Sequence, residues 1–230
     1  MDRLQTLAES CRRHGVSCDI LPADLRQASA PDQLLAACQQ NQWTIQGLVN
    51  NAGLGWQEPF VTQSEERIET MLTVNLMALT RLCRLFLPEM IQRREGFILN
   101  IASTAAIQPV PFFAVYAATK AYVVSLSEAL HEEAAPHGVT VTAVCPGPVH
   151  TEFKQVAGMS ERFFAVAQAV EPCAAACIRA VDQHRAIAWT ALSQRLTSLG
   201  ADLAPRWFRR KLAAALMRLS MPQAASTTSS

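Results

Sequence analysis

The chain has 230 residues, half of them hydrophobic, which is enough to bury one sizeable core and excludes disorder for the body of the protein. Its 20 Lys and Arg residues balance 19 Asp and Glu residues, and a net charge of +1 excludes nucleic-acid binding through an overall positive field. Seven cysteines without a C-x-x-C pair are typical of a reduced protein. Cys173 and Cys177 lie one helical turn apart, but no His or second Cys pair accompanies them, so we expect no metal site.

The N-terminal residues lack the basic-then-apolar profile of a signal peptide, and no apolar run reaches the roughly 18 residues that a membrane span needs. We therefore expect a cytoplasmic protein.

The first third of the chain predicts helix, strand, helix and strand. An amphipathic helix ends at Gly15, and a short β-branched strand from Val16 to Leu21 is closed by Pro22. A second helix follows, and the apolar strand Ile45 to Val49 runs into a turn that contains glycine.

The next part continues the alternation. Ser64, followed by two glutamates, begins a long helix that ends at Gly96. Its predicted apolar stripe consists of Leu72, Leu76, Leu79, Leu82 and Phe86. The remaining predicted elements are a strand from Phe97 to Ala102, a helix from Phe113 to Ala135 and a buried strand from Val139 to Cys145.

Continuous apolar strands separated by long helices predict a parallel sheet covered on both faces. We expect an α/β fold, a Rossmann-like doubly wound parallel sheet in three layers, over residues 1–190. A C-terminal amphipathic helical extension is predicted over 191–222, and a disordered tail over 223–230.

Tyr116 and Lys120 stand four residues apart in a predicted helix, so both side chains lie on one face. A phenol with a pKa near 10 is a poor proton donor or acceptor at neutral pH, and a nearby ammonium favours the phenolate and lowers that pKa. The pair is a candidate acid/base, although a surface helix pair would show the same spacing.

Two further segments follow predicted strands, at the sheet edge where ligands bind in open α/β sheets, and one polar residue lies on an apolar helix face. Ser103 follows the strand that ends at Ala102, and its hydroxyl could bind a substrate carbonyl oxygen. Asn75 is an amide on an apolar helix stripe, where it needs a partner. Asn50-Asn51-Ala52-Gly53 places two amides and a glycine at the end of a strand.

Taken together and in this order, these motifs resemble those of the short-chain dehydrogenase/reductase family over roughly residues 1–190. The matching segments are Asn50-Asn51-Ala52-Gly53, Thr73-Val74-Asn75-Leu76, Asn100-Ile101-Ala102-Ser103, Tyr116-Ala117-Ala118-Thr119-Lys120 and Pro146-Gly147-Pro148-Val149-His150-Thr151.

The resemblance implies an oxidoreductase that uses NAD or NADP and a catalytic set of four residues. Tyr116 would be the proton donor or acceptor, Lys120 would lower its pKa and hold the nicotinamide ribose, and Ser103 would orient the substrate carbonyl. Asn75 would support a water relay. The implied cofactor-binding residues, besides Tyr116 and Lys120, are Asp24 near the adenine, Asn50, Ala52 and Gly53 at the cofactor edge, and Pro146, Gly147 and Thr151 on the nicotinamide side.

The resemblance also implies a missing part. Family members begin with a strand, a glycine-rich turn, a helix and a second strand, and Met1 falls where that second strand should have ended. The strand Ile45 to Val49 would then lack a neighbour. Three explanations stay open: a misplaced start codon or truncated gene, a non-catalytic remnant, or a partner that supplies the strands. We favour the first because the downstream motifs are intact.

Apolar residues flank the candidate site on both sides and predict a small hydrophobic substrate, although they could equally pack onto the core or a subunit. They are Val110, Pro111, Phe112, Phe113, Phe153, Val156, Met159, Phe163 and Phe164. No serine-hydrolase elbow or P-loop motif occurs, and the spacing of His131 and His137 does not match a zinc protease helix.

Residues 203–219 interleave basic with apolar and aromatic side chains, a pattern that suits peripheral contact with a membrane or docking on a subunit. The leading prediction is interconversion of a hydrophobic alcohol and a ketone or aldehyde by a homo-oligomer. The alternative is a non-catalytic interaction protein that keeps the dehydrogenase scaffold but has lost cofactor binding.

Overall fold

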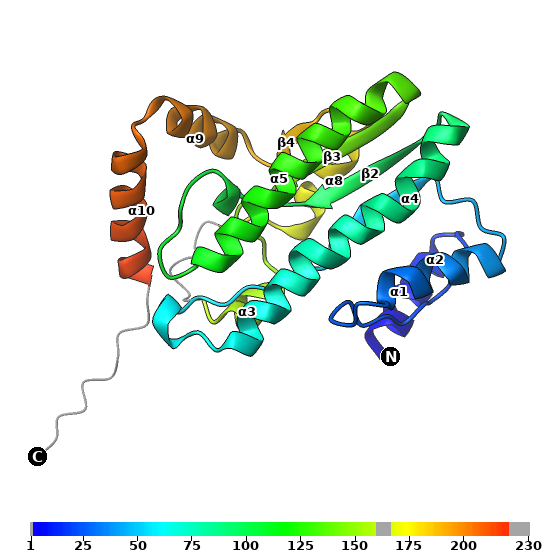
Figure 1. Cartoon of the computed structure of the whole chain (residues 1–230), viewed down its shortest axis with the longest axis horizontal. Coiled ribbons are helices and arrows are strands. Elements are labelled where there is room, and N and C mark those ends of the chain that lie inside the picture. The colour runs from blue at the N-terminus through cyan, green and yellow to red at the C-terminus, as the bar shows by residue number, and fades with distance from the viewer. Residues whose placement is uncertain (1, 160–166, 221–230) are drawn as a thin grey trace, which may run out of the picture.

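The structure is a computed structural model, and it describes residues 2–159 and 167–220. Four parallel strands form one sheet in the order β1-β2-β3-β4 (Figure 1). The strands are β1 (Gly47–Asn50), β2 (Gly96–Ile101), β3 (Val139–Cys145) and β4 (Ile187–Trp189). The α-helices are α1 (Asp2–Arg13), α2 (Ala30–Gln40), α3 (Glu65–Leu72), α4 (Leu79–Arg93), α5 (Ala114–Ala134), α6 (Phe153–Ala157), α8 (Val170–Asp182), α9 (Leu192–Leu203) and α10 (Arg206–Ser220). Shorter turns are η1 (Phe60–Thr62), η2 (Thr73–Ala78), η3 (Thr104–Ala106) and η4 (Ala135–His137).

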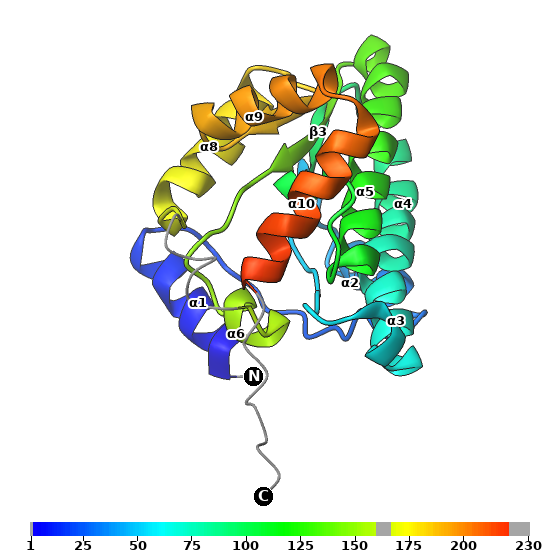
Figure 2. The ribbon, with the colours of Figure 1, turned by 90° about the vertical axis from the view of Figure 1, so that its left-hand side faces the viewer.

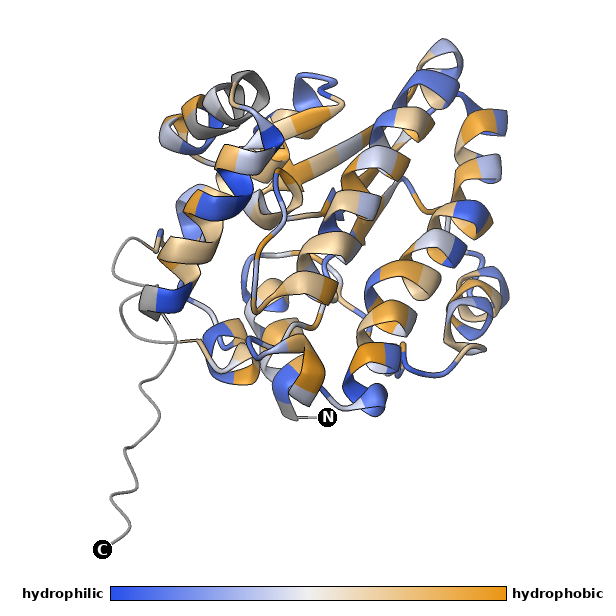
Figure 3. Cartoon of the chain, turned by 60° about the vertical axis from the view of Figure 1, so that its left-hand side comes forward, coloured by the Kyte–Doolittle hydropathy of each residue, from blue (hydrophilic) through white to orange (hydrophobic). Residues whose placement is uncertain are grey.

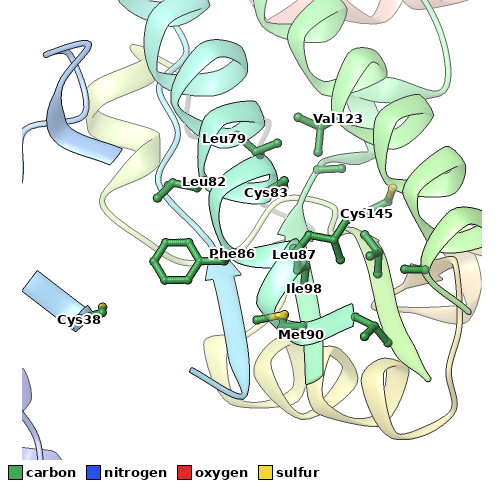
Figure 4. Close-up of a cluster of buried hydrophobic side chains, with 14 residues drawn as sticks. Cys38, Leu79, Leu82, Cys83, Phe86, Leu87, Met90, Ile98, Val123 and Cys145 are labelled. Carbon is green, nitrogen blue, oxygen red and sulfur yellow. The ribbon is translucent and has the colours of Figure 1, made fainter. Parts of the chain in front are cut away.

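Strand residues alternate between two apolar layers. Ile98 and Val141 point into a cluster with α2, α4 and α5, whereas Leu99 and Val144 point into a cluster with α8. Figure 4 shows the larger cluster, in which Leu82, Phe86 and Met90 of α4 pack towards the strands. The sheet is therefore covered on both faces, as the strand pattern predicts, and the α/β fold is confirmed.

The helix predicted from Ser64 to Gly96 forms, but it contains a wider turn. Ser64 accepts a hydrogen bond from the backbone N–H of Arg67 at 3.4 Å and caps α3. Residues Thr73–Ala78 form a π-helical turn between α3 and α4. A π turn inserts one residue into the helical period and rotates the buried face. The predicted stripe is therefore wrong at Leu72, which is 39% exposed, and Met71, Val74 and Asn75 are buried instead.

The strand predicted from Val16 to Leu21 is wrong. Residues 16–24 form no regular element, and Val16 is exposed. A β-strand exists only by pairing, and no strand of the described residues lies beside this segment.

By length and composition alone, the helical run Glu65–Arg93 could cross a membrane, which we did not expect from the sequence. Half of its most apolar stretch is buried inside the protein, as in the core helix of many folded domains.

Candidate functional site

The site lies at the carboxyl ends of β1, β2 and β3, where parallel α/β sheets bind ligands. A cavity of about 1230 Å³ opens there. Its lining includes most of the predicted site residues: Ala52, Gly53, Ser103, Tyr116, Lys120, Pro146, Gly147 and Thr151. The structure thus brings together side chains that are up to 99 positions apart, from Ala52 to Thr151 (151 − 52 = 99).

Tyr116 and Lys120 both lie on the buried face of α5, as their spacing predicts. The Tyr116 ring stacks on Phe113 with 4.3 Å between ring centroids, and Phe153 covers another side at 5.4 Å. Burial raises the pKa of Tyr116 to about 12, while its hydrogen bond with the side chain of Ser103 opposes that rise. The phenol therefore keeps its proton at neutral pH.

Lys120 lies near the Tyr116 ring but donates its hydrogen bond to the backbone. Its Nζ donates a hydrogen bond to the carbonyl oxygen of Ile101 at 2.7 Å and lies 5.7 Å from the centroid of the Tyr116 ring. Burial lowers the pKa of Lys120 to about 8. Burial is the main cause of the raised Tyr116 pKa, and Lys120 ties α5 to the end of β2.

Ser103 follows β2 and begins η3, where its Oγ accepts a hydrogen bond from the backbone N–H of Ala105 at 3.1 Å. The same side chain reaches the phenol of Tyr116. The Ser103 and Tyr116 side chains are therefore neighbours at the end of β2.

Asn75 is 1% exposed and lies within the π turn, not on the cavity wall. Its amide nitrogen donates to the carbonyl oxygen of Leu54 at 2.8 Å and to Thr119 Oγ1 at 3.0 Å, and its Oδ1 accepts from the N–H of Leu54 at 2.9 Å. These are the partners that a buried amide needs. Asn75 is therefore a positioning residue that joins α5 to the loop after β1.

Asn50 also lies outside the cavity lining. Its Nδ2 donates to Asn100 Oδ1 at 2.8 Å, and Asn100 in turn donates to Ser127 Oγ at 2.9 Å. This buried chain of polar groups connects β1, β2 and α5. The sequence did not single out Asn100 or Ser127, although a buried amide in an apolar strand is a signal that could have found them.

Asp24 lies in a separate hollow that shares Ala52 and Gly53 with the main site. It is paired with Arg26, whose hydrogen bonds keep the pKa of the Asp24 carboxyl below its ordinary value. Asp24 is thus close to the cofactor-edge residues but outside the main cavity.

The loop after β1 contains two glycines whose backbone lies close to the side chains of Lys120 and Tyr116. A Cβ on Gly53 would lie 3.3 Å from Lys120 Nζ, and a Cβ on Gly55 would lie 2.7 Å from the Tyr116 ring. The backbone of this loop can reach the acid/base pair only without side chains.

The apolar wall contains residues predicted from the sequence and others that were missed. Val110, Phe113, Phe153, Val156 and Met159 line the cavity, whereas Phe163 and Phe164 lie outside the described residues. Leu54 from the β1 loop and Ala213 and Met217 from α10 were missed. Only the four-residue spacing of Ala213 and Met217 hinted that they share a face.

Cys173 and Cys177 line the same cavity from α8. Hydrogen bonds from Cys177, Thr190 and Gln168 lower the pKa of Cys173 to about 7. Among the described residues, no three His, Cys, Asp or Glu side chains gather closely enough to hold a metal ion.

Comparisons with known proteins agree with this geometry. The family model described as short chain dehydrogenase matches residues 1–161. The ketoacyl reductase HetN of Nostoc sp. is 36% identical over 146 residues, which are 62% of this chain and 51% of HetN. The chain spans about half the length of the curated relatives it matches, or less.

Two solved structures superimpose on nearly the whole chain. A short-chain dehydrogenase from Sphingobium yanoikuyae in complex with NADPH is 30% identical, with a TM-score of 0.77 over 98% of this chain and 85% of its own. The bulky-bulky ketone specific alcohol dehydrogenase from Comamonas testosteroni is 26% identical, with a TM-score of 0.71 over 98% of this chain and 83% of its own. With the family model, the fold and the site in agreement, this chain belongs to the short-chain dehydrogenase family.

Proposed function

We propose that the protein is an NAD(P)-dependent oxidoreductase that interconverts a hydrophobic alcohol and a ketone or aldehyde. The observation that carries this proposal is the meeting of Ser103, Tyr116 and Lys120 in one cavity whose remaining wall is largely apolar. Two similar proteins support a ketone substrate, because HetN is named a ketoacyl reductase and the Comamonas enzyme a ketone-specific alcohol dehydrogenase.

The residues present fit the nicotinamide end of the cofactor. Gly53, Tyr116 and Lys120 line one cavity, so a ribose bound there could reach both side chains. For the pyrophosphate, the lining offers Arg3 and no glycine-rich turn among its described residues. A bound nicotinamide dinucleotide would supply the hydride.

The protein's own residues handle the oxygen and the proton. Negative charge develops on the carbonyl oxygen during reduction, and the Ser103 hydroxyl can donate a hydrogen bond to it. Tyr116 carries its proton at neutral pH and can give it to the same oxygen when negative charge develops there. Lys120 holds the end of β2 against α5, which keeps these two hydroxyls on one side of the substrate. Asn75 holds the loop after β1 through its two hydrogen bonds with Leu54.

We also propose that a further strand, encoded upstream in the same reading frame, pairs with the open edge of β1 and completes the cofactor site. Within the described sheet β1 pairs only with β2, and Val49 is 53% exposed. An apolar strand of a parallel sheet is ordinarily paired on both sides. A strand from a second copy of the chain is the alternative outcome.

Titration with NADH and NADPH, followed by nucleotide fluorescence, tests both proposals. Saturable binding that requires the upstream extension supports the strand proposal, and binding by the 230-residue chain alone contradicts it. An absence of binding by both forms contradicts the oxidoreductase proposal and leaves the non-catalytic scaffold.

The acid/base assignment is tested by Tyr116→Phe in a form that turns over. Loss of the hydroxyl should lower kcat at least roughly a hundredfold, since general acid catalysis contributes about that much or more. Tyr122→Phe on the same helix is the matched control, because its hydroxyl is paired with Thr80, not with the site. Equal activities of the two variants would contradict the assignment.

The C-terminal helix suggests a membrane-surface contact, and we propose one through residues 203–219. Trp207, Phe208 and Lys211 are exposed on α10, and Figure 3 shows hydrophilic and hydrophobic residues side by side along this helix. Such a face can bind anionic lipid.

Co-sedimentation with vesicles that contain phosphatidylserine tests this contact. The double variant Lys211→Glu, Arg218→Glu should lose binding at low salt, whereas Arg12→Glu, Arg13→Glu on α1, with the same change in charge, should keep it. Equal losses would show that only net charge matters.

We also propose that the protein is cytoplasmic and forms a homo-oligomer. Cell fractionation tests the location, and light scattering tests the oligomeric state.

A further inference from the structure

The C-terminal helix forms part of the cavity that contains Tyr116. Ala213, Leu216 and Met217 of α10 line this cavity. Met217 is 5% exposed and belongs to one apolar cluster with Phe113, Tyr116 and Met159. Figure 2 shows α10 running across this side of the molecule, between α9 and the region of α6. Residues of the last described helix thus line the same cavity as Tyr116.

The two faces of α10 differ in burial. Ala213 and Met217 are one helical turn apart and both buried, whereas Lys211, Ala215 and Arg218 point away and are exposed. The buried part of the inner face is therefore formed by Ala213, which is small, and Met217, which is long and flexible, while Leu216 lines the cavity from a more exposed position. Met adapts its shape to its neighbours, whereas Ala is small and has no rotatable side chain.

We propose that α10 is the outer wall of the substrate cavity, and that Ala213 and Met217 set the size of the group that the site accepts beside the reacting carbonyl. This inference rests on the proposed function and adds its specificity-determining residues. The apolar lining around them, with Leu54, Val110 and Met159, assigns the class: a ketone with a bulky hydrocarbon substituent.

The two positions should act in opposite directions. Trp at position 213 would occupy part of the cavity and exclude a large substituent. Ala at position 217 would remove three heavy atoms and enlarge the same space. A methylene in an apolar pocket changes discrimination by roughly tenfold or more, so either change should be easy to measure.

The experiment compares kcat/KM for cyclohexanone with that for benzophenone. Ala213→Trp should lower the benzophenone to cyclohexanone ratio at least roughly tenfold, and Met217→Ala should raise it. Ala215→Trp, on the outer face of the same helix, and Met77→Ala, at an exposed methionine, are the matched controls and should leave the ratio unchanged. A ratio that stays constant in both inner-face variants would overturn the proposal.

A second measurement separates this proposal from the proposed function. Isothermal titration calorimetry of benzophenone needs no turnover, so it tests the wall even if the protein reduces neither ketone. Ala213→Trp should weaken benzophenone binding and Ala215→Trp should not. Equal binding by both variants, or no binding by the unaltered protein, would overturn the assignment of α10. If Ala213→Trp does not fold by circular dichroism, Ala213→Val makes the same test with a smaller side chain.

Discussion

The two faces of the sheet differ in how completely they are covered. On the face of α4 and α5, fourteen buried residues form one continuous cluster. On the face of α8, the corresponding cluster has four, and Val49 and Ile178 beside it are 53% and 64% exposed. Tyr116 and Lys120 come from α5, on the well-packed face. The acid/base geometry is therefore fixed by the core, whereas the open face is where a cofactor site would still gain contacts.

The largest expected effect tests this difference in packing directly. Met90 of α4 is fully buried, and Met90→Ala should lower the free energy of unfolding by about 2–5 kcal/mol through lost burial and a cavity. Ile178→Ala on the open face should cost less than about 0.5 kcal/mol, as at exposed positions. Urea unfolding measures both. Similar losses would show that the α8 face is packed as well as the other.

The second prediction concerns the charge that the packed face buries. Burial lowers the pKa of Lys120 from 10.5 to about 8, so the folded state holds fewer protons than the unfolded state between these values. The contribution of Lys120 to stability should therefore rise with pH in this window, by roughly 2 kcal/mol between pH 7 and pH 10.

Lys120→Met provides the reference for that measurement, because it lacks the titrating group. The unfolding free energy of the unaltered protein minus that of Lys120→Met should increase by roughly 2 kcal/mol as the pH rises from 7 to 10. Parallel pH curves would contradict the buried ammonium.

The third prediction compares one thiol from each face. Cys173 on α8 has a pKa lowered to about 7 by its hydrogen bonds, whereas burial raises the pKa of Cys83 on α4 to about 11. Thiolates are the reactive form, so iodoacetamide at pH 7 should alkylate Cys173 at least roughly a hundredfold faster than Cys83.

Peptide mass spectrometry resolves the individual sites. Cys177→Ala should slow alkylation of Cys173, because it removes the strongest hydrogen bond to that thiolate, and it should leave Cys11 unchanged. Equal rates at Cys83 and Cys173 would contradict the contrast between the faces.

The sequence predicted the elements that depend on local pattern and burial. The strand Val139–Cys145 has the predicted bounds, the long helix begins at its Ser64 cap, and the spacing of Tyr116 and Lys120 places both on one face. These features follow from residues close together in the chain.

Features that depend on distant partners could not be predicted. Val16 to Leu21 has a strand-like composition, yet pairing decides whether a strand forms. The π turn at Asn75 shifts the helix face without a signature such as proline or glycine. Lys120 donates its hydrogen bond to Ile101, and Met217 reaches the site from another part of the chain. Residue spacing contains no information on either contact.

The side chain of Asn75 imitates a peptide group. It receives the N–H of Leu54 and donates to the carbonyl of the same residue, the two bonds that a neighbouring β-strand would make. One side chain of a helix thereby gives this loop residue the hydrogen bonds that a strand would give it. The Leu54 amide should consequently exchange with deuterium as slowly as an amide inside the sheet, and the glycine that precedes it should have little freedom to hinge.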